Sequence, residues 1–406
     1  MKKQFRAIAF LIIGVVAAGA GENPPESSAR VYRQSNAWVQ EVNGVLTAAR
    51  TLRITTDAGS VKIRAAAQPN ITYVLKKRVY NCVSDSDAQK YLSQFKITAW
   101  QQGDSAVLRG QCEFCGNRKH GSMDFDIVVP KDTALVNINT EGGDISVTGI
   151  SGRMEAETGG GNIQADEVGG LVRVTSGGGN IDIGRTGGDL RLETGGGNVR
   201  VLSAKGRIDA QSGGGNITID SGQGMALETG GGTINISNAN GDLRATTGGG
   251  NITVGSVAGL AVLETGGGSI RLSSANGPVS AQSGGGSIEL FKLRQGAQAE
   301  TGGGGIVAEF ISLAGGRESH LETSAGDIVV YLADDLKATV NAAIDVGNGH
   351  AIQTDFSTIK VTTEGDEMGG MQEFYANGSL NGGGPYLKLH TTVGNIELRK
   401  RTLAQR

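Results

Sequence analysis

Aromatic residues, prolines and cysteines are scarce in this 406-residue sequence, which has 4% aromatic residues, six prolines and three cysteines. So few prolines exclude a collagen-like triple helix, whose Gly-X-Y triplets depend on proline. Charged residues make up 19% of the chain and the net charge is −3, so the sequence lacks the basic surface that a nucleic-acid partner requires. Disorder is also excluded, because 38% of the residues are hydrophobic and the net charge is small.

Glycine, in contrast, is abundant, with 67 residues in the chain. The usual share is roughly 7%, and each glycine inside a helix costs about 1 kcal/mol relative to alanine. A large helical protein is therefore excluded, and the composition indicates an all-β chain rich in turns.

The N-terminus resembles an export signal, because Lys2, Lys3 and Arg6 flank the apolar stretch Ala7 to Ala18 and Ala18-Gly19-Ala20 follows as a cleavage pattern. We predict a signal peptide over residues 1–20. An uncleaved anchor is the alternative, but twelve apolar residues are fewer than the roughly 18–20 needed to span a bilayer. We expect an extracytoplasmic protein (periplasmic, surface-bound or secreted) with no membrane span after cleavage.

The three cysteines are Cys82, Cys112 and Cys115. Export favours a structural disulfide, but the odd number leaves one thiol over and the pairing open. Two alternatives are a redox pair formed by Cys112 and Cys115, and half of a zinc site that adds Cys82 and His120.

A short glycine motif recurs through the middle of the chain, as in Thr158-Gly-Gly-Gly-Asn-Ile163. It returns about every 18 residues, and only the step between Ser212 and Thr229 is shorter, by one residue. The copies begin at Thr140, Thr158, Ser176, Thr194, Ser212, Thr229, Thr247, Thr265, Ser283 and Thr301, with a degenerate copy at Thr323 and isolated relatives at Thr56 and Thr391. A fixed short period indicates stacked units that bury their apolar faces against one another.

Within each unit, apolar and polar residues alternate, as in Leu190-Arg191-Leu192, which is the signature of a strand with one buried face. We predict a parallel β-solenoid, similar to a right-handed β-helix, with about 18 residues and two short strands per coil. Each coil should add roughly 4.8 Å of height. No aromatic residue lies between Phe125 and Phe291, so we expect an interior too narrow for rings.

The repeated glycines should form a sharp corner in each coil, which demands positive φ angles and close approach of backbones. The Thr or Ser before them should cap the turn through its hydroxyl. The following asparagines should stack as a ladder along the solenoid. They are Asn162, Asn180, Asn198, Asn216 and Asn251.

The residue before each Thr or Ser alternates between glutamate and a neutral residue, as in Glu193, Gln211 and Glu228. In a coil formed by one repeat, this alternation separates like charges, which are unfavourable when directly opposite. A coil formed by two repeats would instead place Glu193 directly above Glu228.

The regions that flank the repeats are less regular. We divide the chain into the signal peptide, a linker (21–48), an N-terminal β-rich capping region with one helix (49–139), the solenoid (140–328) and a C-terminal β cap (329–406). The helix is expected over Ser84–Phe95, with Tyr91, Leu92 and Phe95 on one face. The cap contains the acidic loop Glu364–Met371.

A resemblance to a known family rests on Asp126-Ile-Val-Val-Pro130, on Val136–Val147, on the repeated Gly-Gly-Gly-Asn-Ile turns, and on the closing segments Leu380–Leu389 and Gly394–Leu398. They are similar to the bacterial putative-adhesin β-strand-repeat domains of unknown function, also grouped with toastrack-like envelope domains. The resemblance covers roughly residues 50–400. It implies a right-handed β-solenoid exposed in the bacterial envelope and carries no catalytic residues.

No constellation of catalytic residues emerges from the repeats, which contain no cysteine and no histidine before His320. Calcium-binding solenoids repeat Gly-Gly-x-Gly-x-Asp every nine residues, and an Asp follows the motif's Ile only at Asp182. We therefore expect no catalytic, cofactor or metal site, although the acidic loop could hold one ion.

The expected function is that of a non-enzymatic structural or adhesive module with an envelope, matrix or cell-surface partner. An envelope-stress or signalling accessory that binds a membrane-associated partner is the alternative. A polysaccharide-active β-helix enzyme is the third hypothesis.

Overall fold

The computed structural model describes residues 30–112, 121–347, 349–364 and 372–401. Its contacts divide the chain into two compact units, one ending at Thr140 and the other beginning at Glu141. The predicted signal peptide lies outside the described residues. Among the residues that are described, no helix has the length and apolar character needed to cross a membrane.

The first unit contains nine strands and one helix in two sheets. One sheet has the order β1-β2-β5-β8-β4 and the other β6-β7-β3-β9. The elements are β1 (Arg30–Gln34), β2 (Ala37–Leu46), β3 (Thr51–Thr56), β4 (Val61–Ala66), β5 (Ile71–Tyr80), α1 (Asp85–Leu92), β6 (Phe95–Gln102), β7 (Ser105–Cys112), β8 (Gly121–Pro130) and β9 (Leu135–Thr140).

The sequence-based boundaries of this unit need two corrections. Residues 30–46 are not a linker but form β1 and β2, and β2 pairs along its whole length with β5. The helix begins as expected, because the Ser84 hydroxyl accepts a hydrogen bond from the Asp87 N–H (3.2 Å). It ends at Leu92, so Phe95 belongs to β6 and is buried there.

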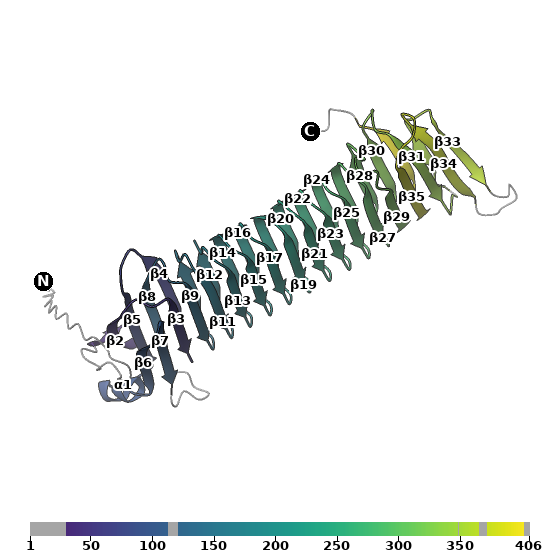
Figure 1. Ribbon diagram of the computed structural model, residues 1–406. Helices are drawn as coiled ribbons and strands as arrows, with labels where there is room; N and C mark the ends of the chain where they lie inside the picture. Colours follow the sequence, from purple (N-terminus) through teal and green to yellow (C-terminus); the bar gives the residue numbers. More distant parts are fainter. Residues whose placement is uncertain (1–29, 113–120, 348, 365–371, 402–406) are drawn as a thin grey trace, which may run out of the picture. The chain divides into compact units, whose positions relative to one another are not determined.

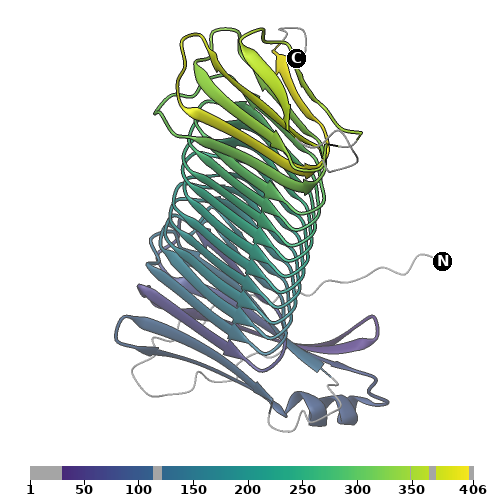
Figure 2. The ribbon, with the colours of Figure 1, turned by 90° about the vertical axis from the view of Figure 1, so that its right-hand side faces the viewer.

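The second unit is a β-solenoid built from two parallel sheets, which are visible as stacked arrows in Figures 1 and 2. Even-numbered strands form sheet A and odd-numbered strands form sheet B, except that β34 belongs to sheet B. Sheet A contains β10 (Ile145–Thr148), β12 (Ile163–Asp166), β14 (Ile181–Thr186), β16 (Val199–Ala204), β18 (Ile217–Gly222), β20 (Ile234–Ala239), β22 (Ile252–Val257), β24 (Ile270–Ala275), β26 (Ile288–Leu293) and β28 (Ile306–Phe310). Sheet B contains β11 (Arg153–Thr158), β13 (Val172–Ser176), β15 (Leu190–Thr194), β17 (Ile208–Ser212), β19 (Met225–Thr229), β21 (Leu243–Thr247), β23 (Ala261–Thr265), β25 (Val279–Ser283) and β27 (Ala297–Thr301).

The strand registers settle the length of a coil. Glu193 lies beside Gln211, and Gln211 lies beside Glu228 in the next coil. The prediction of one repeat and two strands per coil is therefore confirmed, and a coil formed by two repeats is excluded.

The interior of the solenoid is filled with aliphatic side chains, because alternate residues point inward in the sheet B strands and at the start of the sheet A strands. The expectation that no ring fits inside is wrong at one end. Phe310 is completely buried in β28, where the register with β26 shifts between Leu290 and Leu293.

The corner at each glycine triplet is held by a buried hydroxyl that bonds to two coils. Thr194 is a representative example: its Oγ1 donates to the Gly179 carbonyl of the preceding coil (2.8 Å) and accepts from the Gly197 N–H of its own coil (3.2 Å). The side chain is only 2% exposed. The same pair of bonds is made by Thr158, Ser176, Ser212, Thr229, Thr247, Thr265, Ser283 and Thr301.

Close approach of backbones, without positive φ, accounts for the first and third glycines of the triplet. A Cβ on Gly195 would lie 2.2 Å from the Gly177 carbonyl oxygen, and one on Gly197 would lie 2.1 Å from that of Gly179. A Cβ on the middle residue, Gly196, would meet nothing within 4 Å. None of these triplet glycines has a positive φ, so that part of the sequence-based explanation is wrong.

The solenoid does not end at residue 328 but continues with coils in a different order from the chain. β30 (Ile328–Leu332) pairs with β28, and β29 (Ser319–Ala325) pairs with β27. The next coil is formed by the last two strands, β35 (Tyr386–Val393) and β36 (Ile396–Lys400). β31 (Ala338–Ile344) and β32 (Ile352–Thr354) stack beyond them, and β34 (Glu373–Leu380) and β33 (Ile359–Glu364) follow as antiparallel strands.

The first prediction concerns the glycine triplet. Gly195→Ala and Gly197→Ala should each destabilise the protein by about 1–3 kcal/mol, because the new methyl group overlaps a backbone that cannot move away. Gly196→Ala, the matched control, should change the stability by less than about 0.5 kcal/mol. Urea unfolding followed by circular dichroism measures the difference, and equal effects at all three positions would contradict the steric explanation.

The second prediction concerns the buried hydroxyl. Thr194→Val keeps the shape of the side chain but leaves the Gly179 carbonyl and the Gly197 N–H without their partner, so we expect a loss of roughly 1–3 kcal/mol. Thr175→Val, on the outer face of the neighbouring strand, is the control and should be nearly neutral. A neutral result for Thr194→Val in the same unfolding experiment would show that the hydroxyl is dispensable.

Candidate functional site

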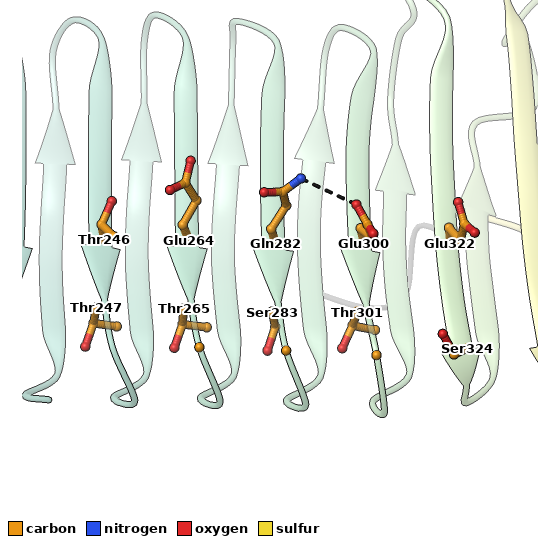
Figure 3. Close-up of a pocket in the computed structure, with 13 residues that line it drawn as sticks. Thr246, Thr247, Glu264, Thr265, Gln282, Ser283, Glu300, Thr301, Glu322 and Ser324 are labelled. Carbon is orange, nitrogen blue, oxygen red and sulfur yellow. Dashed lines mark hydrogen bonds between the residues drawn. The ribbon is translucent and has the colours of Figure 1, made fainter. Parts of the chain in front are cut away.

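A groove of about 490 Å³ runs along the outer face of sheet B, beside the glycine corners. Figure 3 shows the row of side chains in it, one from each successive coil. The row consists of Thr246, Glu264, Gln282, Glu300 and Glu322. The β-strand register positions all five, because each occupies the residue before the buried Thr or Ser of its coil.

Electrostatics shape this row, which contains acids and neutral residues but no lysine or arginine. Glu264 is paired with Arg244 on the neighbouring strand (3.0 Å). Gln282 separates Glu264 from Glu300 and donates a hydrogen bond to the latter (3.4 Å). The alternation ends after Glu300, because Glu322 lies directly beside it in the next coil.

Two histidines compensate for this excess of negative charge. Glu322 lies within hydrogen-bonding distance of His320 Nε2 (2.8 Å) and His390 Nδ1 (3.3 Å). The other ring nitrogen of His390, Nε2, lies 3.0 Å from Asp345 Oδ1. We call these four residues the His–acid cluster. They come from β29, β35 and the residue after β31, which the order of the coils brings side by side.

The cluster shifts the pKa values of two of its members in opposite directions. The hydrogen bond with His320 lowers the pKa of Glu322, against the opposing effect of partial burial, and His390 adds to the lowering. Partial burial by itself would lower the pKa of His390, but its hydrogen bonds and charge interactions with Asp345 and Glu322 outweigh this effect and raise it. Both shifts favour an ion pair between Glu322 and His390.

The predicted asparagines lie at the opposite end of the glycine turn, where they are exposed. Their side chains do not bond to one another, as they would in an amide ladder, but to the backbone of the next coil. The Asn180 side-chain oxygen accepts from the backbone N–H of Asn198 (2.8 Å), and Asn198 does the same for Asn216 (2.8 Å). Asn162, Asn216 and Asn251 accept likewise from the next coil. Each asparagine thus binds a backbone amide at the corner.

The cysteines lie in the first unit, away from this groove in the sequence. Cys82 is a free thiol, and Cys112 is disulfide-bonded. Cys115 and His120 lie outside the described residues, as does most of the acidic loop, residues 365–371. Across the described ranges, no group of three or more His, Cys, Asp or Glu side chains is arranged to hold a metal ion.

The His–acid cluster was not predicted from the sequence, although one signal for it exists. Thr391-Thr-Val-Gly-Asn-Ile396 is a relative of the repeat, so His390 occupies the same position as Glu322 before Thr323. The buried Thr391 hydroxyl indeed bonds to the Gly326 carbonyl (3.0 Å), as the motif predicts. The contribution of Asp345 could not be anticipated, because its segment has no copy of the motif.

Comparisons with known proteins return few matches. No model of a protein family matches this chain, and no curated protein does. A solved structure of a putative cell adhesion protein from Clostridium sporogenes is 9% identical, covering 89% of this chain and 100% of that one, with a TM-score of 0.18. A putative adhesin from Bacteroides fragilis is 10% identical, covering 89% and 97%, with a TM-score of 0.20. Both descriptions are of the same kind as the family that the repeats resemble, but scores this low say nothing about the function of this chain.

The third prediction concerns pH. The raised pKa of His390 gives stability that is complete below about 6.5 and is lost as the pH rises through the folded value, whereas the lowered pKa of Glu322 gives stability that is present above about 4.3 and is lost on acidification. Thermal unfolding should therefore show a weak maximum between these values. Because the side chains of the pair are partly exposed and solvent screens their charges, we expect a change of roughly 0.5 kcal/mol.

The His390→Gln variant should abolish the decrease in stability above about pH 6.5. His350→Gln, which removes a histidine outside the cluster, serves as the control. A decrease that persists in His390→Gln would show that another group causes it.

Proposed function

We propose that this protein is a non-enzymatic, extracytoplasmic structural or adhesive module, and that the sheet B groove is its binding face. The observation that carries the proposal is the repetition along the groove: successive coils offer the same outward position to a partner. A partner with its own repeat can form the same weak contact many times, and the sum gives avidity.

The chemistry of the groove favours a polymer that carries amino groups. Its charged lining residues are Glu264, Glu300 and Glu322, and the other residues are threonine, serine, glutamine and glycine. Glu264 and Glu300 lie two coils apart, which corresponds to about 9–10 Å. An extended chain with cationic groups at a similar interval would place one beside each carboxylate, and its hydroxyl groups would meet the neutral side chains between them.

Rigidity also supports a role in binding. The groove lies on strands that are hydrogen-bonded on both sides and whose opposite face is fully buried. Side chains held in this way lose little further freedom on binding, which lowers the entropic cost of association. The predicted signal peptide is the support for an extracytoplasmic location.

The fourth prediction tests the groove with chitosan oligosaccharides, which carry amino groups, and with their fully N-acetylated counterparts, which do not. Isothermal titration calorimetry should detect binding of chitosan and at least tenfold weaker binding of the acetylated chains. The double variant Glu264→Lys, Glu300→Lys should lose chitosan binding, because it replaces attraction with repulsion.

The matched control is Asp182→Lys, Glu289→Lys on sheet A. It makes the same change in charge, and each double variant breaks one exposed ion pair, Glu264 with Arg244 or Glu289 with Arg271. Equal loss of binding in both double variants would mean that net charge, not the groove, attracts the polymer. Absence of binding by the wild-type chain would overturn the proposed ligand class.

A further inference from the structure

The edge strand of sheet B, β33, leaves one edge of the second unit open. β33 pairs with β34 in an antiparallel register, with Ile359 beside Gly378 and Glu364 beside Glu373. Within the described part of the chain, no second strand pairs with β33. Figure 1 shows it as the final arrow of the second unit. Such an edge presents a row of unpaired N–H and C=O groups that can bind another strand.

The side chains of β33 are accessible to a partner. Every residue from Lys360 to Glu364 is exposed, and Val361 retains 41% of its surface. An exposed apolar residue on an open edge is a hazard for aggregation, which proteins commonly suppress by placing a lysine on the edge. Lys360 is such a lysine, but β33 also carries Glu364 at its other end, which can offset the charge of a lysine on a partner strand.

The strand is complementary to itself. In an antiparallel pair of two β33 strands centred on Thr362, Lys360 of each copy lies opposite Glu364 of the other, and Val361 lies opposite Thr363. Opposite charges across strands stabilise a pair, whereas like charges in this position destabilise it. Shifting the register by two residues in either direction separates Lys360 from Glu364, so the charges select this alignment.

We propose that β33 pairs with β33 of a second copy of this chain, related by a two-fold axis, so that sheet B continues from one molecule into the other. Such an interface is isologous: it closes on itself and yields a dimer without growing into a fibre. A pairing of two six-residue strands buries little surface, so the dimer should be weak and depend on concentration. Dimerisation through β33 does not depend on what the groove binds.

The test uses sedimentation velocity of the purified chain over a range of concentrations. The wild type should form dimers as the concentration rises. Lys360→Glu and Glu364→Lys should each weaken dimerisation by about tenfold or more, because both cross-strand pairs become repulsive. Lys205→Glu makes the same change in charge as Lys360→Glu at an exposed position elsewhere in the solenoid, and as the control it should dimerise like the wild type.

Two further measurements distinguish this pairing from a general effect of charge. The double variant Lys360→Glu, Glu364→Lys restores both pairs with their signs exchanged and should dimerise like the wild type. A mixture of the two single variants should form a heterodimer, because both glutamates of the Lys360→Glu chain then lie opposite lysines of the Glu364→Lys chain.

Circular dichroism confirms in each case that the variant is folded. A wild type that stays monomeric at all concentrations overturns the proposal, and so does a dimer that every variant retains. Failure of the mixture and of the double exchange to restore association likewise shows that β33 does not pair with itself.

Discussion

The structure of the second unit depends on one constraint: at the glycine corner, the backbones of successive coils approach so closely that no Cβ fits between them. The buried Thr or Ser hydroxyl satisfies the backbone polar groups at this close contact, since it bonds to both coils where water cannot reach. The close backbone contact and the hydroxyl together fix where each coil turns. They therefore also determine which residue faces outward beside the corner. The groove is a consequence, because its row of side chains immediately precedes these hydroxyls.

Much of this fold could be predicted from the sequence, because the physical causes are local and repeated. Alternation of apolar and polar residues revealed the strands, and the alternation of glutamate with neutral residues at Glu193, Gln211 and Glu228 revealed the length of the coil. The cause of the glycines was only half predicted. Composition does not distinguish a residue that needs positive φ from one that has no room for a side chain, and here the second reason applies.

The candidate site was less predictable, because the glutamates of the groove and the His–acid cluster have different origins. Glu264 and Glu300 follow the repeat, so their positions could be read from the period. The His–acid cluster joins His390 to Glu322 and Asp345, which precede it by 68 and 45 residues, respectively. It arises because the coils stack out of order. A break in periodicity signals that the order changes but not which strands become neighbours.

The order of the final coils also has a consequence for assembly. The chain forms β31 to β34 before β35 and β36, yet β35 and β36 occupy the layer between them and the rest of the solenoid. During synthesis, which proceeds from the N-terminus, the outermost layer therefore emerges before the layer on which it rests. Each coil up to β30 can stack on the preceding coil as it is made, whereas β31 and β32 find their parallel neighbours only after β35 and β36 have been made. β31 can pair with β34, and β34 with β33, before then, so the outermost layer is joined to the rest of sheet B only through strands that are made after it.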